Sequence, residues 1–255
     1  MKKIINKGLE KFNLNLIRYD KLQALKEALE EVRLDASAEF EALLNTDYFN
    51  ALESKAQLRQ DLFVLHELDY KKNGFFVDFG ATNGFDLSNS YLLEKRFGWN
   101  GILVEPARLW HSDLRKNRNV NIETNCVWKD SDSVITFNEA NAPEYSTIDS
   151  YSRFDFHSKL RRGGKKYDVK TISLLDLLDK YNAPEIIDYL SIDTEGTEYD
   201  ILSNFDFNKY KFRAITVEHN YTSVRGKIFK LLTKNGYYRK NIALSEFDDW
   251  YILKQ

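Results

Sequence analysis

Cysteine is nearly absent from this chain of 255 residues, which contains a single one, Cys126. One thiol excludes an intrachain disulfide framework and a thiolate-rich zinc cluster. Long apolar runs are absent too, and none approaches the roughly 18 residues of a membrane-spanning helix, so we expect no transmembrane segment. The first residues are basic but lack the apolar core of a secretory signal, which predicts a cytoplasmic protein.

An excess of charge of one sign is also missing. The chain has 37 Lys and Arg residues against 39 Asp and Glu residues, which gives a net charge of -2. A protein that binds nucleic acid through bulk electrostatics is normally more basic, so we expect no nucleic-acid partner. Apolar residues make up 43% of the chain, enough for a packed core. This composition is compatible with a monomer or a homo-oligomer.

The N-terminal part, residues 1–53, is predicted to be a helical segment that precedes the main domain of residues 54–255. Apolar residues recur there at helical spacing: Leu22, Leu25, Leu29 and Val32. A capping-box pattern at residues 54–57 then precedes a second set on one helix face: Leu58, Leu62, Leu65 and Leu68. Packing of these leucines against the main domain is the simpler interpretation, and docking to a membrane or a partner is the alternative.

From residue 74 onward, apolar strands alternate with helical stretches. The strands are predicted at residues 75–77, 101–105, 120–128, 187–193 and 214–218. This alternation predicts an α/β fold with a mostly parallel sheet and helices on both faces. The last forty or so residues differ, because residues 236–243 and 249–254 are typical of an antiparallel hairpin. A long connection follows the third strand, with strand signals at residues 134–137 and 167–172. We expect this insertion, about residues 129–170, to lie on the substrate side.

A turn rich in small residues follows the first strand and is predicted to open a helix. It reads DFGATNG at residues 78–84, so that Gly80, Ala81 and Gly84 let the backbone approach a nucleotide-like ligand. An acid, Glu105, ends the second strand about 20 residues later, where a carboxylate can bind both ribose hydroxyls. The turn and the acid together predict a nucleoside-containing cofactor.

The acid that leads this turn, Asp78, discriminates between cofactors. A carboxylate repels a pyrophosphate but suits an ammonium group. S-adenosylmethionine has an amino-acid tail and a sulfonium group without a phosphate, so the sequence favours it over NAD. An NAD-dependent oxidoreductase remains the alternative enzyme, and a catalytically silent binding protein of the same fold is the third hypothesis.

Four ordered blocks resemble the FkbM family of S-adenosylmethionine-dependent methyltransferases. They are FVDFGATNG at residues 76–84, FGWNGILVEP at 97–106, DYLSIDTEGTEYDIL at 188–202 and VEHN at 217–220. The resemblance covers about residues 54–253 and implies a Rossmann-like class I methyltransferase sheet with a C-terminal antiparallel hairpin. It also implies O-methyl transfer to a hydroxyl of a saccharide, glycoconjugate or natural product. Gln60 and Asp61 are implied as a lid on the cofactor pocket.

The predicted cofactor site combines this lid, the small-residue turn, the strand-end acids and the end of the third strand near the adenine. Its residues are Gln60, Asp61, Asp78, Gly80, Ala81, Gly84, Glu105, Asn125, Cys126 and Asp193. The acceptor is expected to meet the insertion at Tyr145, Ser146 and Arg153. The basic residues 161–166 in the same insertion are interpreted as a solvated loop, with a phosphate or an acidic sugar as the alternative contact.

Catalysis is predicted at the ends of the fourth and fifth parallel strands, which carry Asp193, Glu195, Glu218 and His219. Either a base takes the proton of an acceptor hydroxyl, or Asp193, Glu218 and His219 hold a divalent cation such as magnesium. Without metal, His219 is the preferred base because its ordinary pKa lies closest to neutral pH. A structural role for this histidine is the competing interpretation.

Overall fold

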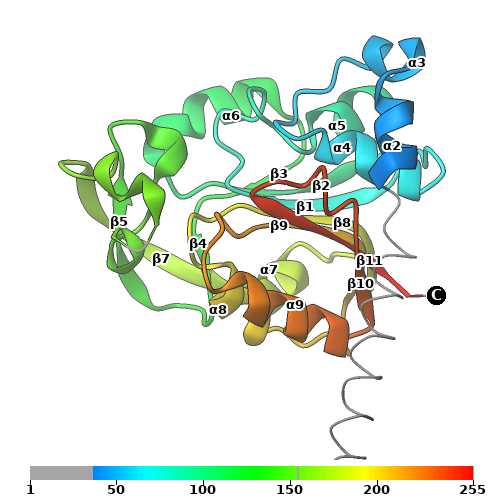
Figure 1. Cartoon of the computed structure of the whole chain (residues 1–255). Coiled ribbons are helices and arrows are strands. Elements are labelled where there is room, and N and C mark those ends of the chain that lie inside the picture. The colour runs from blue at the N-terminus through cyan, green and yellow to red at the C-terminus, as the bar shows by residue number, and fades with distance from the viewer. Residues whose placement is uncertain (1–36, 154, 255) are drawn as a thin grey trace, which may run out of the picture.

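A seven-stranded mixed sheet forms the centre of the molecule (Figure 1). The computed structural model describes residues 37–153 and 155–254. Across the sheet the strands are β10 (Tyr237–Lys240), β11 (Asp248–Leu253), β9 (Lys211–Glu218), β8 (Ile186–Ile192), β1 (Phe75–Phe79), β2 (Asn100–Val104) and β3 (Asn121–Glu123). The five strands from β9 to β3 are parallel, and β11 is antiparallel to β9 and β10. The predicted α/β sheet with an antiparallel C-terminal hairpin is therefore confirmed.

The strand register brings the predicted site residues to one edge of this sheet. Phe79 pairs with Val104 on one side and with Ile192 on the other, and Ile192 pairs with Val217. The next residue along each of these strands is therefore Gly80, Glu105, Asp193 or Glu218. Carboxyl ends of parallel strands form the usual crevice of open α/β sheets, so this edge is where a ligand site is expected.

Helices cover both faces of the sheet, because its central strands are apolar on both sides. Above it in Figure 1 lie α2 (Ser37–Leu44), α3 (Asp47–Ala51), α4 (Gln60–Glu67), α5 (Tyr91–Phe97) and α6 (His111–Asn117). Below it lie α7 (Leu174–Lys180), α8 (Glu198–Ser203) and α9 (Arg225–Lys234). Alternate residues of β1 divide between these layers: Phe76 is buried with the upper helices and Val77 with the lower ones.

A second, four-stranded sheet lies at the left of Figure 1 and contains the strands of the insertion together with residues 126–128 just before it. Its strands are β4 (Cys126–Trp128), β7 (Lys165–Ser173), β5 (Val134–Glu139) and β6 (Thr147–Ile148). The prediction of one strand over residues 120–128 is wrong. The Glu123 side chain accepts hydrogen bonds from the backbone N–H groups of Thr124 and Asn125, both at 2.9 Å. This local turn ends β3, and the next strand, β4, leaves the central sheet and pairs with β7.

Two predicted helix starts also differ from the structure. The turn at residues 78–84 does not open a helix directly, because the Asn83 Oδ1 accepts from the N–H groups of Phe85 and Asp86 and holds the chain in a loop until α5. The capping box at residues 54–57 is not formed either. The Ser54 hydroxyl donates to Asp61 instead, and the helix begins at Gln60. The predicted end of α5 at Gly98, with φ 70°, is confirmed.

The predicted leucine pattern at residues 22–32 lies outside the described residues. Immediately after it, α2 packs onto the main domain, where the Phe40 ring lies 6.1 Å from the rings of both Phe63 and Trp250. Among the described residues, none of the helices has the length and apolarity to cross a membrane.

Candidate functional site

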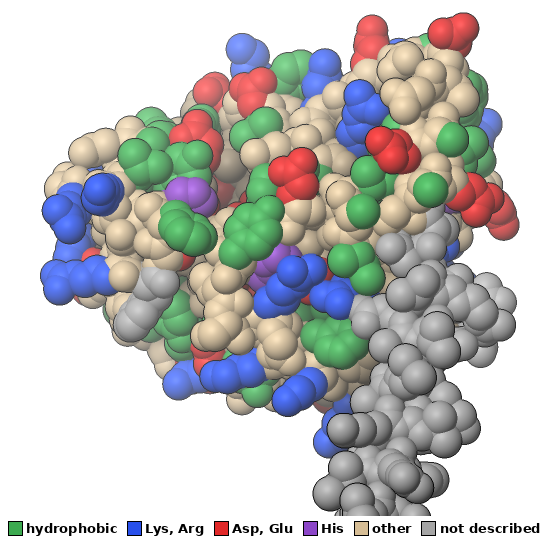
Figure 2. Space-filling view, in the orientation of Figure 1, with side chains coloured by type: hydrophobic (Ala, Val, Ile, Leu, Met, Phe, Trp, Pro, Cys, Tyr) green, Lys and Arg blue, Asp and Glu red, His purple; other side chains and the backbone are tan. Residues whose placement is uncertain are grey.

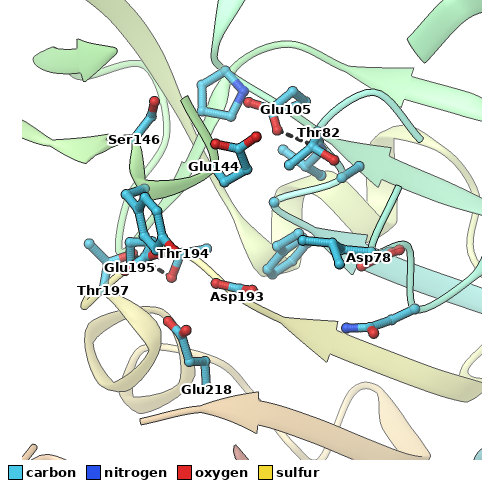
Figure 3. A pocket seen from close by; sticks show the side chains of 18 of the residues that line it. Asp78, Thr82, Glu105, Glu144, Ser146, Asp193, Thr194, Glu195, Thr197 and Glu218 are labelled. Atoms are coloured by element: carbon cyan, nitrogen blue, oxygen red, sulfur yellow. Dashed lines mark hydrogen bonds between the residues drawn. The ribbon is translucent and has the colours of Figure 1, made fainter. Parts of the chain in front are cut away.

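A cavity of about 440 Å³ opens at the carboxyl edge of the parallel strands (Figure 3). Six acids contribute to its wall: Asp78, Glu105, Glu144, Asp193, Glu195 and Glu218. Among the described residues that line it there is no Lys or Arg, and His157 is the only histidine. A low-dielectric cleft lined by one sign of charge concentrates ligands of the opposite sign, so this cavity suits a cationic ligand.

Seven of the ten predicted cofactor residues line this cavity. They are Gln60, Asp78, Gly80, Ala81, Glu105, Cys126 and Asp193. The other three, Asp61, Gly84 and Asn125, are not among its lining residues. Asp61 is buried on α4, where its Oδ1 accepts from Ser54 and from the Leu62 N–H. Its helix neighbour Gln60 donates to Asp248 at 2.8 Å, which fixes the side chain at the cavity wall.

Glu105 ends β2 with its carboxyl group almost fully buried. It accepts hydrogen bonds from the backbone N–H of Thr82 at 2.8 Å and of Ala107 at 2.7 Å. Burial raises the pKa of Glu105 to about 7, although these two hydrogen bonds oppose the rise. The side chain therefore ties the turn after β1 to the end of β2 and also faces the cavity.

The two glycines of the turn are required by close packing within the chain. Gly80 has a φ of 77°, and a Cβ there would lie 2.1 Å from the backbone oxygen of Asp193. Glycine is thus required for the close approach of the ends of β1 and β8. At Gly84, with φ 76°, a Cβ would lie 2.6 Å from the Cγ of Arg118. The predicted close approach of a ligand at Gly84 is wrong, since the Arg118 side chain fills that position.

Three acids gather where β8 and β9 end. Oxygen atoms of Asp193, Glu195 and Glu218 lie within 4.8 Å of one another, although Glu218 is the last residue of β9 and the other two follow β8 (Figure 3). Burial and then the neighbouring Glu195 raise the pKa of Asp193 well above its ordinary value. Burial and then Asp193 do the same for Glu218. Like charges this close favour the retention of a proton or the binding of a cation.

Glu195 differs from its two neighbours because it is already paired with a cation. Its Oε2 accepts from the Arg161 Nη2 at 2.6 Å, from the Asn220 amide at 3.3 Å and lies 3.3 Å from the Nδ1 of His157. Glu198, which begins α8, instead accepts from the N–H groups of Thr194 and Gly196 and stabilises the loop.

His219 does not join this cluster, contrary to the prediction. The side chain is 1% exposed and is not among the lining residues of the cavity. Its Nδ1 accepts from the Tyr221 N–H at 3.0 Å, so its Nε2 donates to the Asp248 backbone oxygen at 3.0 Å. Burial lowers the pKa of His219. Both ring nitrogens bind backbone, which corresponds to the structural interpretation and leaves neither free to bind a metal or an acceptor proton.

Two of the three predicted acceptor residues reach the cavity. Tyr145 and Ser146 line it, with the Ser146 hydroxyl donating to the Pro143 oxygen at 2.6 Å. Arg153 lines a separate cavity of about 470 Å³. Arg162 and Lys166 line that cavity as well, and Figure 2 shows Lys and Arg side chains gathered at this end of the molecule, over the second sheet.

Several cavity residues were not predicted. Phe156 and His157 lie in the insertion, and Asn220 and Tyr221 follow β9. Position after a strand end is the signal that could have identified Asn220 and Tyr221. No comparable signal exists for His157, because its carboxylate partner Glu195 lies 38 residues away in the sequence.

Known proteins similar to this chain are methyltransferases. The family model described as the methyltransferase FkbM domain matches residues 78–248. No curated protein matches the sequence. Among solved structures, a precorrin-6y C5,15-methyltransferase from Geobacter metallireducens is similar at 15% identity, with a TM-score of 0.39 and 70% of each chain covered. The METTL16 methyltransferase domain is similar at 12% identity, with a TM-score of 0.43, 77% of this chain and 66% of that chain.

A putative RNA methyltransferase from Pyrococcus horikoshii is similar at 13% identity, with a TM-score of 0.35, 71% of this chain and 65% of that chain. The chain thus spans about two thirds of the length of these proteins. The family match covers residues 78–248, which include most of the residues that line the cavity, and the sheet is of the Rossmann-like class I methyltransferase type. The chain therefore belongs to the FkbM family of methyltransferases.

Proposed function

We propose that this methyltransferase transfers a methyl group from S-adenosylmethionine to a hydroxyl of a saccharide, a glycoconjugate or a similar polyhydroxylated natural product. One observation carries the choice of acceptor: two large aromatic side chains stand exposed on the wall of an otherwise acidic cavity. Phe156 is 77% exposed and Tyr221 is 61% exposed. Exposed apolar side chains beside a polar cavity mark a binding surface.

The residues that line the cavity support S-adenosylmethionine as the cofactor. S-adenosylmethionine supplies an electrophilic methyl group and carries a sulfonium and an ammonium group. The acids, with no Lys or Arg among the lining residues described, suit both cations and would repel the pyrophosphate of NAD. The amide oxygen of Asn89 is buried at this wall without a hydrogen-bond partner in the described part of the chain. A buried acceptor of this kind needs a donor, which an ammonium group provides.

The residues assigned to the cofactor follow from their chemistry. Glu105 binds the ribose hydroxyls at the end of β2, while Asp78, Asn89 and Asp193 face the amino-acid end. An apolar section of the same wall, made by Cys126, Val127, Phe137 and Ile148, accepts the adenine ring. The acceptor occupies the side of the insertion, where Tyr145 and Phe156 offer flat apolar surfaces to the C–H face of a sugar ring.

A hydroxyl acceptor must lose a proton during transfer, and a divalent cation is one way to promote this. Asp193 and Glu218 are the two acids of the cluster that no basic side chain neutralises among the described contacts. Magnesium commonly uses one or two carboxylates together with water and substrate oxygens. In this version a chelator abolishes turnover and added magnesium restores it.

Methyl transfer to a panel of sugars, glycosides and matched amines, followed by mass spectrometry, tests the acceptor class. We expect hydroxyl acceptors to gain one methyl group and the amines to gain none. Phe156→Ala and Tyr221→Ala should raise KM for the acceptor about tenfold while affinity for S-adenosylhomocysteine stays constant. Methylation of amines alone would contradict the proposal, and cofactor binding without any turnover would favour a silent binding protein.

A further inference from the structure

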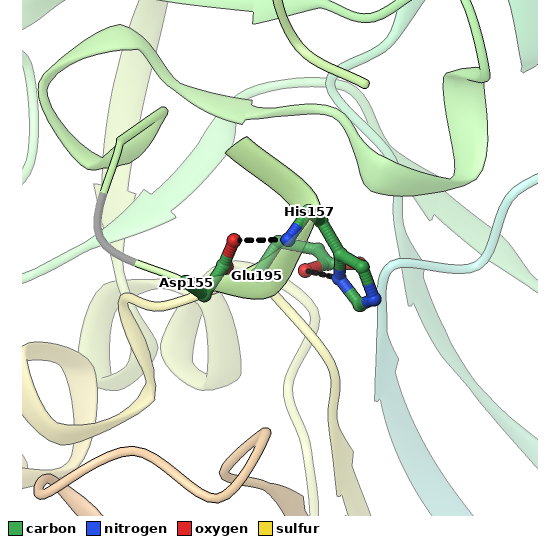
Figure 4. Close-up of side chains that lie close together, drawn as sticks. All are labelled: Asp155, His157 and Glu195. Atoms are coloured by element: carbon green, nitrogen blue, oxygen red, sulfur yellow. Dashed lines mark hydrogen bonds and ion pairs between the residues drawn. The ribbon is translucent and has the colours of Figure 1, made fainter. Parts of the chain in front are cut away.

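An imidazole and a carboxylate form a pair at the wall of the cavity, next to the acid cluster. His157 lies on the 3-10 helix η4 (Phe156–Lys159) of the insertion, and Glu195 lies in the loop after β8. The His157 Nδ1 is 3.3 Å from the Glu195 Oε2 (Figure 4). The imidazole is 27% exposed and lines the cavity, whereas the carboxylate is 6% exposed. A buried acid thus supports a partly open base.

The carboxylate of Glu195 is held in place from several directions. Arg161 donates to it at 2.6 Å and the Asn220 amide at 3.3 Å. The backbone of Glu195 has a φ of 58°, a left-handed conformation that is strained for a residue with a long side chain. The contacts with Arg161 and His157 of the insertion hold the carboxylate in place in this conformation.

The helical turn that carries the imidazole and one face of its ring also have defined contacts. The Asp155 Oδ1 accepts from the backbone N–H of His157 at 2.9 Å and from the Arg161 Nη1 at 2.7 Å. The ring of Tyr145 lies 4.2 Å from the imidazole, measured between centroids. The charged and titratable groups that face His157 are therefore Glu195 after β8 and Asp155, Arg161 and Tyr145 of the insertion. The insertion thus positions a base on the cavity.

We propose that His157 is the general base of methyl transfer and that Glu195 is its positioning residue, an inference that rests on the hydroxyl acceptor proposed above. The Nδ1–H donates to Glu195, which leaves the lone pair of Nε2 free, since no described residue bonds to that nitrogen. As the new O–CH₃ bond forms and the S–CH₃ bond breaks, the proton of the hydroxyl passes to Nε2. A carboxylate on the far nitrogen stabilises the imidazolium that results.

Two competing assignments fit the contacts less well. Asp155, His157 and Glu195 could together surround a metal ion, because their ligand atoms lie within 4.8 Å of one another. The guanidinium of Arg161 already binds both of these carboxylates, so a cation occupies the space between them. His219, the other candidate base, has both ring nitrogens bound to backbone groups.

The hydrogen bond to Glu195 raises the pKa of His157 above its ordinary value of 6.5, against the opposing effect of burial. A general base acts in its neutral form, so turnover should increase with pH and reach half its maximum above pH 6.5. Without the carboxylate the pKa of His157 falls, and this limb of the pH profile moves to lower pH. A residue with a purely structural role would leave the limb where it is.

The first test is His157→Gln, with His66→Gln as a matched control. His66 lies on α4 against the Phe40 ring and is not among the cavity residues. We expect His157→Gln to lower kcat about 100-fold or more, with the affinity for S-adenosylhomocysteine unchanged by calorimetry. The control should retain its rate. A rate within threefold of the wild type, or a parallel loss of cofactor affinity, would overturn the assignment.

The second test follows the pKa of His157 directly by NMR titration, with the resonance assigned by its absence in His157→Gln. Glu195→Gln should lower this pKa by at least half a unit. The pH at which kcat reaches half its maximum should fall by the same amount. Should this variant fail to fold, Glu195→Asp provides the comparison, with a smaller shift in the same direction. An unchanged pKa overturns the pairing whether or not an acceptor is known. Absence of hydroxyl methylation by the wild type would instead refute the proposed function.

Discussion

The side chain of Arg161 joins the insertion to the loop after β8, and its removal should destabilise the fold strongly. The guanidinium is fully buried. It binds the carboxylates of Asp155 at 2.7 Å and Glu195 at 2.6 Å, and it donates to the backbone oxygen of Tyr145 at 2.6 Å. Both carboxylates are also buried, with 5% and 6% of their side chains exposed. Arg161→Met preserves the length and the packing of the side chain but leaves two buried charges without their cation.

Removal of one partner from a buried ion pair costs about 3–5 kcal/mol, so we expect a loss of that size in the free energy of unfolding. The free energy of unfolding of a whole domain is about 5–15 kcal/mol, so a loss of this size should be easy to measure by urea denaturation. Arg162→Met is the control, because this neighbouring arginine is exposed, and it should change stability by less than about 0.5 kcal/mol. A loss below about 1 kcal/mol for Arg161→Met would refute the argument from burial.

Three other predictions concern Glu105 and His219. Glu105→Gln should weaken S-adenosylhomocysteine by about 1.5–3 kcal/mol, measured by calorimetry, and an unchanged affinity would remove this residue from the cofactor site. Because burial raises the pKa of Glu105 from 4.5 to about 7, the folded chain binds more protons than the unfolded chain between these values. The contribution of Glu105 to the free energy of unfolding should thus fall by about 3 kcal/mol as the pH rises from 4.5 to 7. Urea denaturation at several pH values should show that Glu105→Gln lacks this part of the pH dependence. His219→Ala leaves two buried backbone groups unpaired and should cost about 2–4 kcal/mol in urea melts, with turnover within a few fold of the wild type; a folded variant without turnover would restore His219 as the base.

The sheet and its functional edge were predictable because their signals are local. Apolar runs that end in acids identify buried parallel strands and place Glu105, Asp193 and Glu218 at the same edge. The end of α5 at Gly98 was also predictable, since glycine adopts the left-handed conformation without strain.

The errors arise where a side chain makes contacts that its sequence neighbours do not reveal. Glu123 divides the predicted third strand by capping two backbone groups, a contact that apolar patterning ignores. The basic stretch at residues 161–166 has the composition of a solvated loop, yet Arg161 is buried because its partner Glu195 comes from another part of the chain. For the same reason His157 could not be recognised as a partner of that acid.

The acidic wall of the cavity has a consequence for the catalytic cycle. Methyl transfer removes the positive charge of the sulfonium, so the spent cofactor is a neutral thioether at sulfur while the six acids around it are unchanged. The wall therefore attracts the cofactor more strongly before the reaction than after it. The spent cofactor keeps its ammonium group but not its sulfonium charge, so we expect its affinity to decrease less steeply with rising ionic strength than the affinity for the charged methyl donor.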